Sequence, residues 1–229
     1  MKHIGIIGGL SPESTVEYYQ IICRRFNKKF GGLNFPQITI RSINLGELIG
    51  LFESNKWEEV AGMILNAIHD LEDAGAEFAA IAANTPHNAY DLIQRASPIK
   101  VLSIMEATAD TIQKAGIKKV GLLGTKATME YGFFQRTFKD YGIETLIPDA
   151  AERSYIDKTI WEKLSHGRIE KQDRVKHAEI ITRLVEKGAE VAVLGCTELP
   201  LLIQTEDAKV PLFDTARIHA TAILEYAIK

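Results

Sequence analysis

Two stretches of the chain, far apart in the sequence, resemble each other. Residues 73–87, DAGAEFAAIAANTPH, align with residues 186–200, EKGAEVAVLGCTELP, through a shared Gly-Ala-Glu core and the apolar run that follows it. Residues 2–9, KHIGIIGG, align with residues 118–125, KKVGLLGT, in the same order and at nearly the same offset. Two ordered matches predict two related halves of about equal size.

Short apolar runs alternate with longer amphipathic segments along both halves. The runs predict strands at 3–8, 37–43, 78–83, 119–124, 192–195 and 211–213. Apolar residues at the helical spacing predict helices over 12–26, 56–75, 105–116 and 173–188. Gly75, Gly116 and Gly188 end three of these segments, as helix-terminating glycines do. Strands that alternate with helices predict parallel sheets covered by helices on both faces.

The sequence therefore predicts an α/β fold of two pseudo-symmetric, doubly wound parallel-sheet domains with a cleft between them. Residues 1–98 and 214–229 are expected to form the first domain, and residues 99–213 the second. The C-terminal helix is expected to pack back on the first domain. Because open α/β sheets bind ligands beyond the carboxyl ends of their strands, the ends of strands 78–83 and 192–195 are the expected site.

Charge and composition exclude several classes of partner. The net charge is −3 without a Lys/Arg cluster, which argues against nucleic acid or an anionic membrane as the main partner. No stretch approaches the ~20 apolar residues of a transmembrane helix. The apolar run at the start of the chain is too short for the hydrophobic region of a signal segment. We expect a soluble cytoplasmic protein with free thiols at Cys23 and Cys196. The histidines lack ligand spacing, so no metal site is expected.

Cys196 is the leading candidate for chemistry. It lies in LGCTELP, at a predicted strand-to-helix turn, with Thr197 and Glu198 directly after it. Backbone N–H groups and the helix dipole favour a thiolate at such a turn, so the pKa of Cys196 is expected to fall from the usual ~8.5. A buried, inert cysteine is less consistent with the polar residues that follow. Cys23, inside an amphipathic helix, is expected to serve packing only.

The internal repeat places Ala83 opposite Cys196, and Asn84 opposite Thr197. One strand end thus carries a thiol and the other a methyl group. Asn84 and Thr85 are suited to bind a carboxylate, although an ordinary Asx or ST turn at a strand end explains them too. His87 is expected to support this loop.

The segment GGLSPEST (8–15) is neither a dinucleotide-binding fingerprint nor a phosphate-binding loop. Ser11-Pro12-Glu13 predicts a helix start with an N-cap, a proline at the first position and an acid in the first turn. Thr125 and Thr128 occupy the corresponding place in the second half. Both helix starts are suited to bind an anion such as a substrate carboxylate.

Together these segments resemble the aspartate/glutamate racemase family. IGIIGGLSPEST, Asn84-Thr85-Pro86-His87, GLLGT ending at Thr125 and GCTE at 195–198 match its motifs in order along the whole chain, and are most similar to the aspartate racemase-like branch. The resemblance implies an isomerase of D-amino-acid metabolism that works without pyridoxal phosphate or another cofactor. It also implies a homodimer acting on a small amino acid or dicarboxylate.

In this family two cysteines flank the substrate α-carbon; one removes the α-proton and the other returns a proton to the opposite face. Cys196 matches the second cysteine, whereas the position of the first is vacant and holds Ala83. The resemblance also implies a set of substrate-binding residues, namely Leu10, Asn84, Thr85, Thr125, Thr197 and Glu198.

With Ala83, symmetrical two-thiol chemistry is impossible, and racemisation is expected to be impaired or one-sided. Three interpretations stay open: an engineered Cys-to-Ala variant, a natural one-thiol racemase that uses another acid or a water, and a single-cysteine decarboxylase or lyase like the arylmalonate decarboxylases. A carboxylate-binding protein on a racemase scaffold is the non-catalytic alternative.

The substrate side chain also stays open. Family members with acidic substrates tend to supply a cation from two segments that here contain Phe52, and Lys163 with Ser165.

Overall fold

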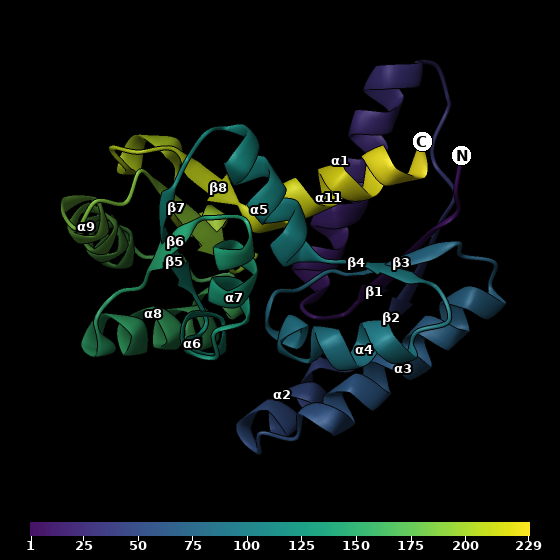
Figure 1. Cartoon of the computed structure of the whole chain (residues 1–229), viewed down its shortest axis with the longest axis horizontal. Helices are drawn as coiled ribbons and strands as arrows, with labels where there is room; N and C mark the ends of the chain where they lie inside the picture. Colours follow the sequence, from purple (N-terminus) through teal and green to yellow (C-terminus); the bar gives the residue numbers. More distant parts are fainter. The chain divides into compact units, whose positions relative to one another are not determined.

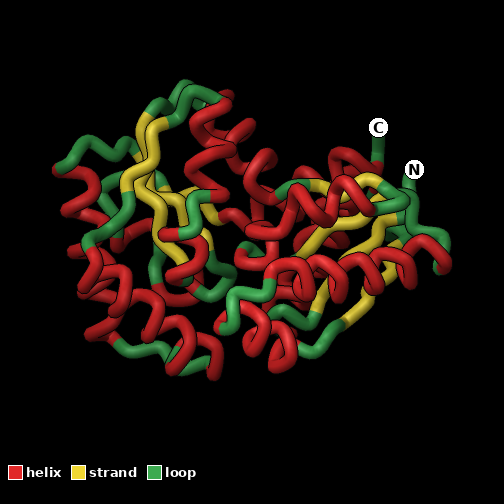
Figure 2. The backbone as a smooth tube through the Cα atoms, turned by 60° about the horizontal axis from the view of Figure 1, so that its bottom comes forward, coloured by secondary structure: helices red, strands yellow, loops and turns green.

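The computed structural model describes all residues, 1–229. The chain divides into two compact units: Met1–Ile104 with Ala216–Lys229, and Met105–Thr215. Each unit contains one four-stranded parallel sheet with helices around it, as the labelled elements of Figure 1 and the yellow strands of Figure 2 show. The predicted α/β class with two parallel sheets is confirmed.

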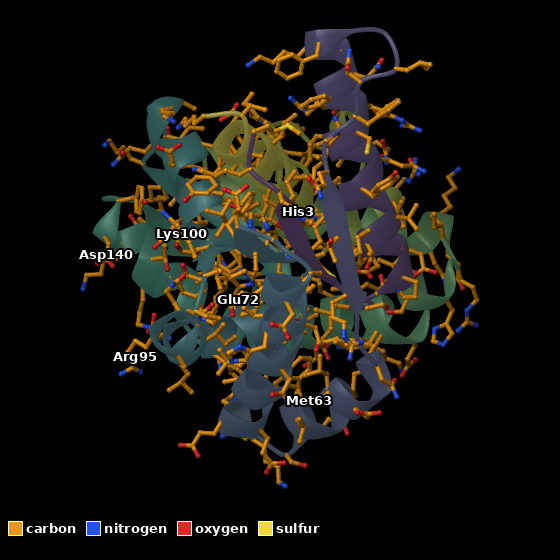
Figure 3. The ribbon with its side chains drawn as sticks, turned by 90° about the vertical axis from the view of Figure 1, so that its right-hand side faces the viewer. His3, Met63, Glu72, Arg95, Lys100 and Asp140 are labelled. Carbon is orange, nitrogen blue, oxygen red and sulfur yellow. The ribbon has the colours of Figure 1, made fainter.

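The first unit has the strand order β2-β1-β3-β4. Its strands are β1 (Ile4–Gly8), β2 (Ile38–Ser42), β3 (Phe78–Ile81) and β4 (Lys100–Leu102). Its helices are α1 (Pro12–Phe30), α2 (Leu45–Glu53), α3 (Trp57–Asp73), the 3-10 helix η1 (Thr85–Ala89), α4 (Tyr90–Ala96) and most of α11 (Thr215–Ala227). Figure 3 labels His3 and Lys100, which directly precede β1 and begin β4.

The second unit repeats this order as β6-β5-β7-β8. Its strands are β5 (Lys119–Gly124), β6 (Glu144–Leu146), β7 (Val191–Gly195) and β8 (Leu212–Asp214). Its helices are α5 (Ile104–Lys114), α6 (Lys126–Glu130), α7 (Phe133–Asp140), α8 (Ala150–Glu162), η2 (Leu164–His166), α9 (Lys171–Glu186), α10 (Leu199–Leu202) and η3 (Thr205–Asp207).

The glutamate of the repeated Gly-Ala-Glu core accepts equivalent backbone hydrogen bonds in both units. The Glu77 carboxylate accepts a hydrogen bond from the backbone N–H of His3, 2.8 Å away. The Glu190 carboxylate accepts from the backbone N–H groups of Lys118 and Lys119, each at 2.8 Å. In each unit this glutamate precedes the third strand and accepts hydrogen bonds from backbone N–H groups at the start of the first strand. The sequence repeat therefore corresponds to the same hydrogen-bonded contact in both units.

Apolar layers cover both faces of the first sheet. On one face, α1 and α11 pack on residues such as Ile4, Ile6 and Phe78. On the other face, α2, α3 and α4 pack on residues such as Ile7 and Ile81. Adjacent residues of β1 thus enter opposite layers, as the alternation of strand side chains requires. The C-terminal helix packs on the first sheet, as expected.

Two details differ from the sequence analysis. The first unit extends to Ile104 rather than to residue 98, because β4 pairs with β3 and therefore belongs to the first sheet. The second boundary lies after Thr215 rather than after residue 213. Strands β4 and β6 are absent from the prediction because neither is an apolar run: β4 is Lys-Val-Leu and β6 is Glu-Thr-Leu. No helix has the length and apolarity to cross a membrane.

Candidate functional site

Two groups of the predicted site residues lie at carboxyl ends of strands, one group in each unit. In the first unit, Ala83, Asn84 and Thr85 follow β3, and Leu10 follows β1, which is paired with β3. In the second unit, Cys196, Thr197 and Glu198 follow β7, and Thr125 follows β5, which is paired with β7. All of these side chains are buried. Each group therefore lies at the carboxyl ends of two adjacent central strands, where open parallel sheets bind ligands.

Asn84 has a buried amide without partners in the protein. Its side chain is 4% exposed, and neither its Oδ1 nor its Nδ2 has a hydrogen-bond partner. The ordinary Asx turn does not form, because Asn84 precedes η1 without a side-chain cap bond. A buried amide without partners costs about 1–3 kcal/mol. Such an amide has both a donor and an acceptor available to a ligand.

His87 anchors the loop that carries Ala83. Its Nδ1–H donates to the Ala83 carbonyl at 2.9 Å, and its Nε2 accepts from the Ile104 backbone N–H at 3.3 Å. Burial lowers the pKa of His87 to about 4, so the ring is neutral at physiological pH. The expected supporting role therefore has a specific geometry: His87 fixes the backbone of the residue at the vacant cysteine position.

A second histidine continues this buried network. His219 on α11 lies edge-on to His87, with the ring centroids 6.0 Å apart. Its Nε2–H donates to the Leu102 carbonyl at 3.0 Å, and its Nδ1 accepts from the Tyr18 hydroxyl at 3.0 Å. Burial and the neighbouring His87 lower its pKa to about 3. Tyr18 on α1 and His219 on α11 thereby connect these two helices to His87 and to the end of β4.

The loop after β1 is shaped by a glycine turn. Gly9 has a φ of 82°, a conformation that glycine adopts without strain. Its N–H donates to Thr15 Oγ1 at 2.8 Å, and Ser11 Oγ caps α1 by accepting from the Ser14 N–H. The predicted N-cap and proline at the start of α1 are confirmed. Leu10 is buried in the same apolar layer as Ala83.

The Cys196 thiol forms a hydrogen bond with a carboxylate. Its Sγ donates to Glu198 Oε2 at 2.8 Å, and Thr197 Oγ1 donates to the same oxygen at 2.9 Å. Cys196 and Glu198 are 7% and 8% exposed. The sequence analysis placed Glu198 among the substrate-binding residues; in the structure its carboxylate accepts a hydrogen bond from the thiol.

The expected direction of the Cys196 pKa was wrong. Burial, followed by the negative charge of Glu198 and its side-chain hydrogen bond, raises the pKa well above the ordinary value of a thiol. The helix-dipole argument fails for a physical reason: α10 has only four residues, so its dipole is small, whereas the carboxylate bears a full charge. At neutral pH the resting group is a protonated thiol.

Thr125 acts as a helix cap. Its Oγ1 accepts from the Thr128 N–H at 3.3 Å and lies 3.1 Å from the Thr128 hydroxyl. It therefore mirrors Ser11, as the repeat predicts.

Of the residues considered for side-chain specificity, Lys163 is already paired. Its Nζ lies 2.8 Å from Asp173 Oδ2 and 2.9 Å from Glu170 Oε2. Ser165 Oγ donates to the Ile160 carbonyl at 2.7 Å, and Phe52 stacks on Trp57.

Cys23 is buried on α1, and burial raises its pKa. No group of three or more His, Cys, Asp or Glu side chains is arranged to hold a metal ion.

Sequence reasoning missed two features of the site: the contact between Glu198 and the thiol, and the network of His87, His219 and Tyr18. The first had a local signal, because a carboxylate two residues after a cysteine at a helix start lies within reach of it. The second had none, because Tyr18 and His219 are 201 positions apart in the sequence.

Comparison with known proteins gives consistent matches over the whole chain. The family model for Asp/Glu/Hydantoin racemase matches residues 7–223. The broad specificity amino-acid racemase RacX of Bacillus subtilis (strain 168) is 24% identical over 223 residues, covering 93% of this chain and 92% of RacX.

Solved structures agree with this match. A candidate Asp/Glu racemase from Yersinia pestis is 39% identical, with a TM-score of 0.94 and 100% of both chains covered. An aspartate racemase homologue from Pyrococcus horikoshii OT3 is 39% identical, with a TM-score of 0.84 and the same coverage. The aspartate racemase of Picrophilus torridus is 25% identical, with a TM-score of 0.81, covering 100% of this chain and 95% of that one.

Proposed function

Because the chain belongs to the Asp/Glu/hydantoin racemase family, we propose that it is an amino-acid racemase that uses Cys196 to exchange the proton at the substrate α-carbon. The proposal includes a cytoplasmic location and independence from pyridoxal phosphate or another cofactor. Aspartate and glutamate are the proposed substrates, since the similar proteins are aspartate and glutamate racemases by name. The observation that carries the proposal is the buried hydrogen bond between Cys196 and Glu198.

The thiol and the carboxylate divide the proton transfer between them. The Cys196 thiol first gives its proton to the Glu198 carboxylate, which its Sγ already contacts at 2.8 Å. The resulting thiolate removes the α-proton of the substrate and becomes a thiol again, while the electron pair of the C–H bond stays on the α-carbon. Burial is the largest cause of the raised pKa of Cys196 and remains after Glu198 has taken the proton, so this thiolate is a stronger base than an ordinary one.

Return of a proton from Cys196 restores the original enantiomer. Inversion requires a second donor, and Ala83 provides only a methyl group where the family has a thiol. We therefore propose one-sided chemistry: the α-hydrogen exchanges with solvent faster than the configuration inverts. In the proposed inversion step, a water or another acid supplies the second proton.

Asn84 is proposed to bind the substrate. Its unpartnered amide has both a donor and an acceptor, which suits the α-carboxylate and the ammonium group of an amino acid. Thr85, Thr125, Thr197 and Leu10 complete the proposed substrate-binding set.

Deuterium exchange tests the proposal. The protein is incubated in D2O with each enantiomer of aspartate and of glutamate, and α-hydrogen exchange is followed by NMR while chiral chromatography measures inversion. We expect exchange with at least one enantiomer, its loss in Cys196→Ala and little change in Cys23→Ala. Loss in the Cys23 variant alone would reverse the assignment.

The single thiol also suits a decarboxylase, in which loss of CO2 leaves a carbanion that Cys196 protonates. Release of CO2 from a substituted malonate, with no exchange on any amino acid, would favour that function over the racemase. If neither activity is present and dicarboxylates still raise the melting temperature, the scaffold serves binding only.

A further inference from the structure

A pocket lies in the second unit at α7 and β6, two elements that Figure 1 labels. Its volume is about 400 Å³, which is within the range of small-molecule sites. Its walls are formed by two residues of α7, the turn that follows and two residues of β6: Gln135, Lys139, Gly142, Ile143, Glu144 and Thr145. None of the proposed substrate-binding residues lines it, so it is a separate place for a ligand.

Two residues of this pocket carry buried polar atoms without a hydrogen-bond partner. Gln135 Nε2 donates to the Met129 carbonyl at 2.6 Å, which fixes the orientation of the amide and leaves Oε1 without a donor. The Thr145 hydroxyl oxygen also has no partner. The other residues with such atoms are Asn84 and His177. An acceptor and a hydroxyl are therefore available to a ligand at one pocket.

Thr145 also offers backbone groups, because β6 is the edge strand of the second sheet. The Glu144 N–H donates to the Lys118 carbonyl at 2.7 Å, and Glu144 pairs with Lys119 of β5. In a parallel ladder the next residue directs its N–H and C=O to the opposite side. The N–H and C=O of Thr145 therefore point to the open edge of the sheet.

The groups at this pocket complement a molecule that has both a carboxylate and an ammonium group. Lys139 is exposed and attracts a carboxylate, to which the hydroxyl and N–H of Thr145 are suited to donate. Gln135 Oε1 requires an N–H donor instead. A simple anion would leave Gln135 Oε1 unpaired, and a simple amine would leave Lys139 unpaired. An α-amino acid has both groups, separated by one carbon.

We propose that the pocket at α7 and β6 is a second binding site, which takes an α-amino acid. The carboxylate of this ligand lies at Lys139 and Thr145, and its ammonium group donates to Gln135 Oε1. The site belongs wholly to the second unit.

Gln135 connects this pocket to α6. Its amide donates to the carbonyl of Met129 on α6, and the Met129 N–H donates to the carbonyl of the cap residue Thr125 at 3.0 Å. Met129 also belongs to the same apolar cluster as Cys196. A ligand on Gln135 Oε1 therefore acts on the amide that contacts α6. This consequence, unlike the binding itself, rests on the proposed racemase function: occupancy of the pocket changes the rate of α-hydrogen exchange.

Titration of the 15N-labelled full chain with L-aspartate tests the binding by NMR. We expect a saturable shift of the Gly142 amide resonance, since Gly142 lines the pocket. Succinate has two carboxylates and no ammonium group, so it should bind about tenfold more weakly. Equal binding of succinate would contradict the amino-acid class.

Variants of the pocket make the titration specific. Thr145→Val and Lys139→Gln should each raise the dissociation constant at Gly142 about threefold to tenfold, because each removes a partner of the carboxylate. Thr182→Val removes a hydroxyl on α9 that donates to the Ala178 carbonyl, and it is the matched control that should leave binding unchanged. A shift that does not saturate, or an equal loss in Thr145→Val and Thr182→Val, would overturn the proposal.

The concentration dependence of α-hydrogen exchange tests the connection to α6. With two sites for aspartate on one chain, the exchange rate should depart from a simple hyperbola, and Thr145→Val should restore the hyperbola. A hyperbola in the original chain, together with a saturable shift at Gly142, would show that the pocket binds without acting on the reaction. Absence of exchange with every amino acid would refute the proposed function, whereas the NMR titration would still decide whether the pocket binds.

Discussion

Cys196 and Glu198 form a buried hydrogen-bonded pair in which Sγ donates to Oε2 over 2.8 Å. The pair lies where β7 ends and α10 begins. The carboxylate raises the pKa of the thiol and is also the nearest group that can take its proton. Glu198 therefore has two opposed effects: its charge lowers the fraction of thiolate at rest, and its carboxylate accepts the thiol proton when the thiolate forms.

Replacing Glu198 by glutamine separates these effects. In Glu198→Gln the negative charge beside Cys196 is removed, so the pKa of the thiol should fall, while burial keeps it above the ordinary value. Alkylation by iodoacetamide at pH 8 should accelerate about threefold for each unit by which the pKa falls, because the thiolate fraction rises about tenfold while the nucleophilicity of the thiolate decreases. Exchange of the substrate α-hydrogen should decrease, because no carboxylate remains to accept the thiol proton.

Thr197→Val is the matched control for this prediction. It removes the other hydrogen bond to Glu198 Oε2 and keeps the negative charge, so Cys196 should remain slow to alkylate. If Glu198→Gln slows alkylation, the carboxylate does not raise the pKa of this thiol. If it leaves α-hydrogen exchange unchanged, Glu198 is not the proton acceptor.

Asn84→Ala should weaken ligand binding without destabilising the fold. The variant removes a buried amide whose lack of partners costs about 1–3 kcal/mol, which offsets the small cavity that it leaves. We expect the free energy of unfolding to be unchanged or higher in urea titrations. The dissociation constant for the substrate should rise about tenfold or more by calorimetry.

Two further variants make this test specific. Asn84→Asp should weaken binding of a carboxylate more than Asn84→Ala does, because it adds a like charge. Asn34→Ala, which removes a side-chain amide with a partner at 2.9 Å, should leave binding unchanged. A large loss of stability in Asn84→Ala would show that this amide has a structural role instead.

Ala83→Cys should make racemisation appear or rise strongly, because it restores a proton donor at the vacant position. The time course of optical rotation from pure L- or D-aspartate measures the change. Ala82→Cys is a matched control, because Ala82 belongs to the opposite apolar layer, with α1 and α11. If Ala83→Cys folds and binds substrate but does not racemise it, the two-thiol interpretation of this position is wrong.

The sequence was sufficient to predict the sheets and their repetition. The apolar runs that form β1 and β5 are clear strand signals, and the Gly-Ala-Glu repeat identifies equivalent positions in the two units. It was also sufficient to locate the site residues at strand ends, because parallel topology puts those ends at one edge of each sheet. Strands β4 and β6 were missed because they begin with polar residues, Lys100 in β4 and Glu144 with Thr145 in β6, and so do not form apolar runs.

The electrostatics of the site could not be derived in the same way. A turn motif around Cys196 suggested a lowered pKa, but the result depends on whether Glu198 turns toward the thiol or away from it. That choice is made by tertiary packing, since the structure places both side chains in the buried interior. In the same way, no local pattern near His87 indicates that the His219 ring of α11 will contact it. Nor does any pattern indicate that Tyr18 of α1 will form a hydrogen bond with His219.

The buried histidines His87 and His219 should make the fold sensitive to mild acid. Their pKa values in the folded state are about 4 and about 3, whereas an unfolded histidine titrates near 6.5. Between these values the unfolded chain binds more protons than the folded one, so stability falls as the pH falls from 6.5. His87 alone should account for roughly 3 kcal/mol by pH 4.

Urea titrations at intervals from pH 7 to pH 4.5 measure this slope, and the window lies mostly above the pH at which carboxylates titrate. The double variant His87→Gln with His219→Gln should start from lower stability and show a flatter dependence on pH. His69→Gln is the control, because His69 is exposed on α3 and should not change the slope. His177, which is buried and has a lowered pKa, accounts for part of the slope that remains. An unchanged slope in the double variant would show that neither ring is held neutral by the fold.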